Sequence, residues 1–289
     1  MKHILVPVDF SSNSEKAATY ACMLAQRTGI TVTLFHAIEP VADNLRQPFS
    51  LHERYLQQAM NGRLNELVNM KYDLEKKYPQ VTITYFAKHG TAVVTICEFI
   101  KTTNPQFVVM GTKGQTALER IFMGSIAKGV VGRSVAPVIV VPDKYIPAKI
   151  DAIVIATNHF EKDTEQLAPI VELASIFGAA IHVIVFIDTD NADGIDYSQM
   201  TFQLNSYAQF LKKQFPNIIF KTELLEGSEF ENTINKYDEA IHADIFTLFA
   251  YPKNTWEKIA HKSMSKKMVS VSKIPMLVVP VKGKSHFTI

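Results

Sequence analysis

Three glycines and a hydroxyl, spaced along one stretch of the chain, are the residues best suited to chemistry. Gly111 and Gly114 follow an apolar run, and Gly124-Ser125 stands directly before a segment that reads as the start of a helix. Glycine has no Cβ to keep an anion away from backbone N–H groups, and a helix amino terminus offers unpaired donors and a favourable dipole. The spacing therefore predicts a phosphate-binding loop.

Other candidate side chains have a structural interpretation beside the functional one. Asp9 follows the first apolar run and either binds a ligand, forms an Asx turn or helix cap, or does both. His36 ends the second apolar run, and a structural histidine is favoured over a catalytic base because no nucleophile, metal partner or paired carboxylate accompanies it. Lys113 lies in the glycine loop, but the spacing is not that of the Walker loop, so a solvated lysine is favoured.

The composition excludes several classes of protein. With 289 residues, 47% hydrophobic and 20% charged, the chain suits two packed domains and not a disordered protein. The 30 Lys+Arg against 28 Asp+Glu are too evenly balanced to indicate a nucleic-acid or membrane partner. No apolar run reaches the ~20 residues of a membrane span, and the amino terminus lacks the apolar region of a signal peptide, so we expect a cytoplasmic protein. Cys22 and Cys97 fall on expected helices and are interpreted as buried thiols.

Apolar runs and helical patterns alternate along the first half of the chain. The alternation is typical of an α/β fold with a parallel sheet that is covered on both faces. The expected strands are residues 4–8, 30–37, 81–86, 107–110 and 135–142, and the expected helices are residues 15–25, a segment from 56 to about 78, residues 92–102 and a segment from 125.

The same pattern then starts a second time. Gly178 stands 149 residues after Gly29, the glycine that closes the first expected helix, and toward the end of the chain the offset shortens to 138 residues. We therefore predict two tandem domains, residues 1–143 and 150–282, joined by a short link.

Together these motifs resemble the universal stress protein family, in its ATP-binding branch. The resemblance rests on Val6-Pro7-Val8-Asp9-Phe10-Ser11, on His36, and on Gly111-x-x-Gly114 followed after nine residues by Gly124-Ser125. It covers nearly the whole chain as two tandem copies. It implies two Rossmann-like α/β domains (flavodoxin-like, or adenine nucleotide alpha hydrolase-like), each with a five-stranded parallel sheet.

The resemblance also implies an ATP site in the first domain, with or without Mg²⁺. Asp9 would lie near the ribose or adenine, Ala37 would line the adenine pocket, and the glycines and Ser125 would surround the phosphates. No catalytic residue and no metal ligand is implied. The full set of nucleotide-binding residues is Pro7, Val8, Asp9, Ala37, Met110, Gly111, Lys113, Gly114, Gly124, Ser125 and Ile126.

The second copy departs from this pattern. Proline offers no N–H, phenylalanine fills the space of a phosphate, and asparagine lacks the charge of aspartate. We therefore expect nucleotide binding in the first domain only. The matching positions hold Phe249, Pro252, Lys262 and Asn158 in place of Gly111, Gly114, Gly124 and Asp9, and only Ser125 is kept, as Ser263.

The function implied is that of an ATP-binding stress-response or regulatory protein. Motifs of adenylating enzymes and a supported general base are absent from the sequence, so binding without dedicated catalysis is favoured over a slow ATPase or another enzyme of adenylate chemistry. An interaction module that no longer binds nucleotide is a third alternative. Because many family members dimerise through the last strand, we expect residues 138–141 and 277–279 to pair in an intramolecular pseudo-dimer, and further homo-oligomerisation is left open.

Overall fold

The computed structural model describes residues 2–39, 49–112, 123–146, 149–191, 196–251 and 273–281. The chain divides into two compact units, Met1–Asp143 (unit 1) and Lys144–Ile289 (unit 2). None of the helices in the described part of the chain combines the length and apolar character needed to cross a bilayer.

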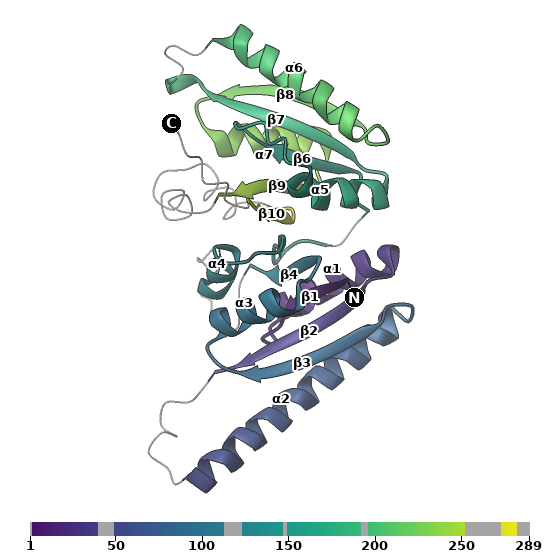
Figure 1. Cartoon of the computed structure of the whole chain (residues 1–289), viewed down its shortest axis with the longest axis vertical. Helices are drawn as coiled ribbons and strands as arrows, with labels where there is room; N and C mark the ends of the chain where they lie inside the picture. The colour runs from purple at the N-terminus through teal and green to yellow at the C-terminus, as the bar shows by residue number, and fades with distance from the viewer. Residues whose placement is uncertain are drawn as a thin grey trace. The chain divides into compact units, whose positions relative to one another are not determined.

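Unit 1 is an open, doubly wound α/β sheet with the strand order β3-β2-β1-β4-β5 (Figure 1). All four strand pairs are parallel. Its elements are β1 (His3–Pro7), α1 (Ser12–Thr28), β2 (Thr31–Ile38), α2 (Phe49–Lys77), β3 (Ile83–His89), α3 (Ala92–Thr103), β4 (Phe107–Gly111), α4 (Ser125–Val131) and β5 (Val138–Val141).

Helices cover both faces of this sheet. On β2, the Phe35 ring stacks on Phe99 of α3 with the centroids 4.4 Å apart, whereas the next residue, His36, faces the side on which α2 lies. Successive strand residues point to opposite faces, so α2 and α3 lie on opposite sides of the sheet. Every residue of β1 and β5 is buried, as expected for parallel strands with two covered faces.

The ends of α1 follow from the polar and glycine residues around it. The Ser11 side chain caps the amino end by accepting a hydrogen bond from the Ser14 N–H, and Gly29 ends the helix in the left-handed region at φ 68°. Glycine adopts that conformation without a steric penalty. The predicted cap and the predicted closing glycine are both confirmed.

The two cysteines are free and buried, as predicted. Burial raises the pKa of the Cys22 thiol to about 12. Burial also raises the pKa of the Cys97 thiol. A thiol that stays protonated at neutral pH is a weak nucleophile, so these side chains act as small core residues.

Several element boundaries differ from the prediction by a few residues; β3, for example, spans Ile83–His89 and not residues 81–86. The last strand of unit 1 begins at Val138 and not at Val135, because the Ser134 hydroxyl closes a turn by donating to the Ala136 carbonyl (2.7 Å). Pro137 follows and has no N–H for a ladder bond. The helix expected from residue 56 begins earlier, at Phe49, and Figure 1 shows it continuing well past the end of β3.

Unit 2 repeats the architecture with the strand order β8-β7-β6-β9-β10, and its strand pairs are also parallel. Ile4 pairs with Phe107 in unit 1 and Ile153 pairs with Ile245 in unit 2, which reproduces the offsets of 149 and 138 residues. The predicted fold class is confirmed. The elements are β6 (Ala152–Ala156), α5 (Thr164–Phe177), β7 (Ala180–Asp188), a 3₁₀ turn (Thr189–Asn191), α6 (Tyr197–Gln214), β8 (Phe220–Gly227), α7 (Phe230–Ile241), β9 (Ile245–Ala250) and β10 (Met276–Pro280).

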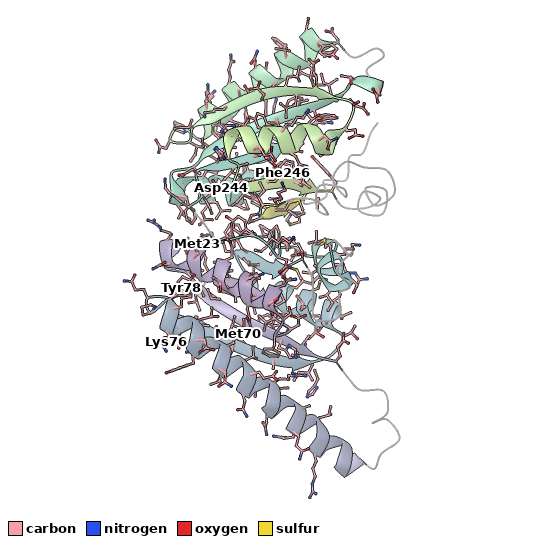
Figure 2. The ribbon with its side chains drawn as sticks, turned by 180° about the vertical axis from the view of Figure 1, so that it is seen from behind. Met23, Met70, Lys76, Tyr78, Asp244 and Phe246 are labelled. Atoms are coloured by element: carbon pink, nitrogen blue, oxygen red, sulfur yellow. The ribbon has the colours of Figure 1, made fainter. Side chains whose placement is uncertain are left out.

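The amino ends of two strands in unit 2 are joined by one carboxylate. Asp244, labelled in Figure 2 beside the buried Phe246, accepts hydrogen bonds from the N–H groups of Asp151 and Ala152 at 2.7 and 3.0 Å. Gly178 ends α5 at φ 68°, as Gly29 ends α1. The amino edge of unit 2 is therefore held by a side-chain carboxylate together with backbone hydrogen bonds.

Candidate functional site

The residues expected to bind nucleotide lie at the carboxyl edge of the sheet in unit 1. β1 pairs with β2 on one side and with β4 on the other, so the direction of winding reverses between β1 and β4. Open α/β sheets bind ligands outside the carboxyl ends of the strands at such a reversal. Pro7 and Gly111 end their strands there, Ala37 is the penultimate residue of β2, and Gly124 caps α4.

Not every predicted site residue has a described position. Lys113 and Gly114 lie outside the described residues, as do Pro252, Lys262 and Ser263 of the second copy. Their predicted roles stay predictions.

Asp9 forms the turn that leads into α1. Its Oδ1 atom accepts hydrogen bonds from the Ser11 N–H (3.1 Å) and the Ser11 hydroxyl (2.6 Å), while the Ser11 Oγ accepts from the Ser14 N–H (3.2 Å). This is an Asx turn joined to a helix cap. The structural alternative for Asp9 is therefore confirmed, and the position of its carboxylate is set by the turn.

Val8 and Met110 are buried strand-end residues. Val8 is 5% exposed, and both of its backbone groups are used within the protein: its N–H donates to the Phe35 carbonyl (2.8 Å), and its own carbonyl accepts from His36 Nδ1 (2.7 Å). Met110 is also 5% exposed and lies within β4. These two residues shape the floor of the edge, and the other predicted residues are left to contact a ligand.

Gly111 is required by packing between β4 and α1. A Cβ atom at this position would lie 2.9 Å from the Asn13 carbonyl oxygen and 3.0 Å from its carbonyl carbon, both backbone atoms that cannot move aside easily. The glycine therefore allows the first turn of α1 to lie against the end of β4. The sequence argument explained this glycine only by the approach of a phosphate, and it missed the packing reason.

Gly124 does not supply a free N–H group. Its N–H donates to the Thr112 carbonyl (2.7 Å), and its own carbonyl accepts from the Lys128 N–H (3.0 Å), as in a helix cap. The expectation that this glycine donates to phosphate is wrong on this point. The donors that point out of α4 are those of the first turn, at Ser125, Ile126 and Ala127, because first-turn N–H groups have no intrahelical acceptor and the N-cap residue, Gly124, has no side chain that could bond them.

Three side chains from different elements gather behind the Asp9 turn. The Phe10 ring lies 4.7 Å from the His36 ring, and the Arg63 guanidinium of α2 lies over the Phe10 ring at 5.7 Å. Phe10 has φ 61°, which costs a residue with a bulky side chain about 1–2 kcal/mol. Arg63 also forms an ion pair with Glu66 at 2.6 Å.

The His36 ring is fixed by a hydrogen bond to the backbone. Because Nδ1 lies 2.7 Å from the Val8 carbonyl oxygen, that nitrogen carries the proton. Burial lowers the pKa of His36 below the ordinary value, the hydrogen bond to Val8 acts in the opposite direction, and the nearby Arg63 charge lowers the pKa further. The geometry is that of a structural histidine, as predicted. Nothing in the residue pattern indicated Arg63, which reaches the turn only because α2 folds back on β2.

The matching edge of unit 2 is built differently. The helices α1 and α5 end at matching glycines, but α1 has 17 residues and α5 has 14, so the first turn is missing from α5. Phe249, buried at 8% exposure, stands where Gly111 admits that turn in unit 1. In place of that turn, the chain runs as a loop from residue 157 to 163.

A buried carboxylate occupies this loop. Glu161 is 8% exposed, its Oε2 atom accepts from the Thr157 hydroxyl (2.6 Å), and its Oε1 atom accepts from the Tyr251 hydroxyl. The Tyr207 hydroxyl of α6 donates to the Glu161 carbonyl (2.7 Å). Burial, followed by the neighbouring Glu161, raises the pKa of both tyrosines. The network joins the ends of β6 and β9 to α6.

The position that corresponds to Ala37 is also filled. Phe186 stands 149 residues later, is 7% exposed and packs edge-on against Phe230 with the ring centroids 5.0 Å apart. Ala37 itself is only partly buried. An adenine pocket of the kind expected in unit 1 is therefore occupied by an aromatic side chain in unit 2.

Comparison with known proteins identifies relatives of the first half of the chain. Residues 1–142 match the model of the universal stress protein family. A universal stress protein of Thermus aquaticus is 28% identical over 140 residues, which is 48% of this chain and 98% of that protein. The universal stress protein MJ0531 of Methanocaldococcus jannaschii is 27% identical over 140 residues, 48% of this chain and 81% of the relative.

A solved structure extends the likeness in fold to both units. The crystal structure of a universal stress protein from Archaeoglobus fulgidus has a TM-score of 0.69 at 17% identity and covers 96% of each chain. At 17% identity the match is evidence for the fold alone. The sequence and family matches together show that residues 1–142 of the chain belong to the universal stress protein family.

Proposed function

We propose that unit 1 binds an adenine nucleotide, with ATP as the ligand, and that unit 2 does not. The observation that carries the proposal is the amino terminus of α4, which lies beside the winding reversal and has as its N-cap Gly124, a residue without a capping side chain. Backbone N–H groups of a helix amino terminus favour an anion, and the Ser125 hydroxyl can donate as well. The choice of an adenine nucleotide as the bound anion rests on the family resemblance.

The remaining residues take roles that fit their positions. The Asp9 carboxylate would accept from a ribose hydroxyl, and Ala37 would face the base, where a larger residue fills the space in unit 2. Gly111 supports the site indirectly by letting α1 reach the edge. Lys113 and Gly114 are proposed to complete the phosphate loop, with or without Mg²⁺.

A regulatory role fits this site better than catalysis does. The Nδ1–H group of His36 donates to the Val8 carbonyl and its ring packs against Phe10, so the described contacts of this histidine are those of a structural residue. Nucleotide binding would then act through conformation or association, in a stress response. A cytoplasmic location and the intramolecular pseudo-dimer remain predictions.

Calorimetry with a proline scan of two helix starts tests the proposal. Ser125→Pro removes the first N–H of α4, and proline suits the first position of a helix because Gly124 has an extended ψ of 157°. We expect one ATP per chain in the wild type and about 10–100-fold weaker binding in the variant, as for the loss of a hydrogen bond to a charged group. Ser125→Ala, which removes only the hydroxyl, should have a smaller effect.

The matched control lies at the start of α5 in unit 2. Thr164→Pro changes the same helix position after Asp163, whose ψ of 111° also accepts a following proline. ATP affinity should not change in this variant. Two equivalent ATP sites per chain, or wild-type affinity in Ser125→Pro, would contradict the proposal.

A further inference from the structure

The Asp9 turn depends on a residue in an unfavourable conformation. Phe10 directly follows Asp9 and has φ 61°, in the left-handed region that glycine adopts most readily. This conformation turns the chain so that the Ser11 N–H and hydroxyl both reach the Asp9 carboxylate. Whatever holds Phe10 therefore sets the position of the carboxylate.

Two side chains from other elements hold the Phe10 ring. The His36 ring of β2 packs against it at 4.7 Å and is itself fixed by the bond from Nδ1 to the Val8 carbonyl. The Arg63 guanidinium of α2 lies 5.7 Å from the ring centroid, within the range of a cation–π interaction, and Glu66 orients it from one turn further along α2. The ring is thus clamped between the sheet and α2.

Unit 2 does not keep this arrangement. His159 stands 149 residues after Phe10, and the left-handed residue of the loop is Phe160 (φ 52°), one position further on, whose ring contacts Tyr207 at 5.5 Å. Valine, Val185, occupies the position of His36, 149 residues later. The left-handed phenylalanine directly after Asp9 and the histidine that packs against its ring are therefore particular to the unit with the candidate site.

We propose that Arg63 and His36 are positioning residues, which act through the Phe10 ring to hold the Asp9 carboxylate where it meets the ribose hydroxyls of a bound adenine nucleotide. The inference rests on the proposed function, because it concerns the same site. It makes α2 part of the ligand recognition of unit 1 without any contact between α2 and the ligand.

The test compares the affinities for ATP and 2′-deoxy-ATP in matched variants of the full chain. Arg63→Gln should weaken ATP binding about 3–10-fold, the size expected for loss of one partly exposed cation–π contact and looser positioning, and should reduce the preference for ATP over 2′-deoxy-ATP. Arg63→Lys keeps a cation over the ring and should restore most of both. A role in folding alone would not change the preference between the two nucleotides.

A glycine pair separates positioning from stability. Phe10→Gly relieves the left-handed conformation, so the melting temperature should stay within about 5 °C of the wild type while ATP affinity falls at least about 5-fold. Phe160→Gly makes the same change in unit 2 and should leave the affinity unchanged. If the wild type binds ATP and Phe10→Gly keeps both its affinity and its preference, the inference is overturned, whereas a wild type that binds no adenine nucleotide would overturn the proposed function itself.

Discussion

The carboxyl edges of the two units differ at the end of one strand and at the start of the helix that follows the first strand of each unit. In unit 1, Gly111 lets the first turn of α1 approach β4 to a distance that no Cβ atom would allow. In unit 2, Phe249 stands at the same place, the turn is absent, and the loop that replaces it buries Glu161. The comparison shows that a glycine in a ligand-binding motif can be required primarily by the packing of a helix against a strand.

The same edge also differs in how its polar groups are satisfied. In unit 1 the N-cap residue of α4 is Gly124, which has no side chain to bond the first-turn donors, and this suits an external anion. In unit 2 a carboxylate of the chain itself collects the Thr157 and Tyr251 hydroxyls. One edge is suited to a ligand, and the other is closed by internal hydrogen bonds.

Removal of the buried carboxylate should have the largest effect on stability. Glu161→Ala leaves the Thr157 and Tyr251 hydroxyls without their acceptor in a buried place, and we expect the free energy of unfolding to fall by about 2–4 kcal/mol in urea titrations. Glu239→Ala is the control, because Glu239 has 74% of its side chain exposed and should change stability by less than about 0.5 kcal/mol. Equal effects of the two changes would show that Glu161 does not close the edge.

Two Gly→Ala substitutions should change the free energy of unfolding in opposite directions, which tests the packing role of Gly111. Gly111→Ala places a Cβ 2.9 Å from the Asn13 carbonyl oxygen and should lower the free energy of unfolding by about 1–3 kcal/mol. Gly62→Ala, on α2 with no atom within 4 Å of the added Cβ, should raise it by about 0.5–1 kcal/mol. A neutral Gly111→Ala in thermal unfolding would remove the packing reason for this glycine.

The smallest effect concerns a helix position where the units differ in polarity. Asp238 of α7 corresponds to the fully buried Ile100 of α3, since each carbonyl accepts a hydrogen bond from the residue that ends its helix. Burial raises the pKa of Asp238 to about 7 from an ordinary value of 3.8. The folded state therefore holds the proton more tightly, and stability is lost as the pH rises from about 4 through 7.

Replacement of Asp238 by the residue of unit 1 should remove this pH dependence. At pH 8, Asp238→Ile should be about 1–2 kcal/mol more stable than the wild type, and the difference should shrink toward pH 4, where the wild-type carboxyl is protonated. Urea unfolding at the two pH values measures this. A constant difference across that range would mean that the carboxyl does not titrate with folding.

Much of the fold could be predicted from local patterns. Gly29 and Gly178 ended their helices as expected, because the need for a left-handed residue is local and glycine meets it at little cost. The offset between the two repeats could also be predicted from the sequence, and matching strand pairs in the two units show the same offset. The start of β5 was misplaced, since the turn closed by Ser134 leaves no strong mark in the residue pattern.

The candidate site was predicted in location but not in detail. The sequence placed Asp9, Ala37 and Gly124 on segments that do meet at one edge, because carboxyl ends of parallel strands lie together. It could not show that the Gly124 N–H is taken by the Thr112 carbonyl, which depends on how the strand end meets the helix. Arg63 was missed because nothing in a polar helix face indicates which aromatic ring it will cover.

By itself, then, the sequence determined two α/β repeats and the edge at which a ligand would bind, since apolar runs, helical periodicity and cap residues act over a few neighbouring positions. Only the tertiary structure decided which glycine serves packing, which N–H groups stay available, and how Glu161 closes the second edge. Those outcomes depend on contacts between segments about 50 to 130 residues apart, such as Arg63 over Phe10, Asn13 against Gly111 and Tyr251 with Glu161. Such long-range contacts form only when the sheet assembles, so no local sequence pattern predicts them.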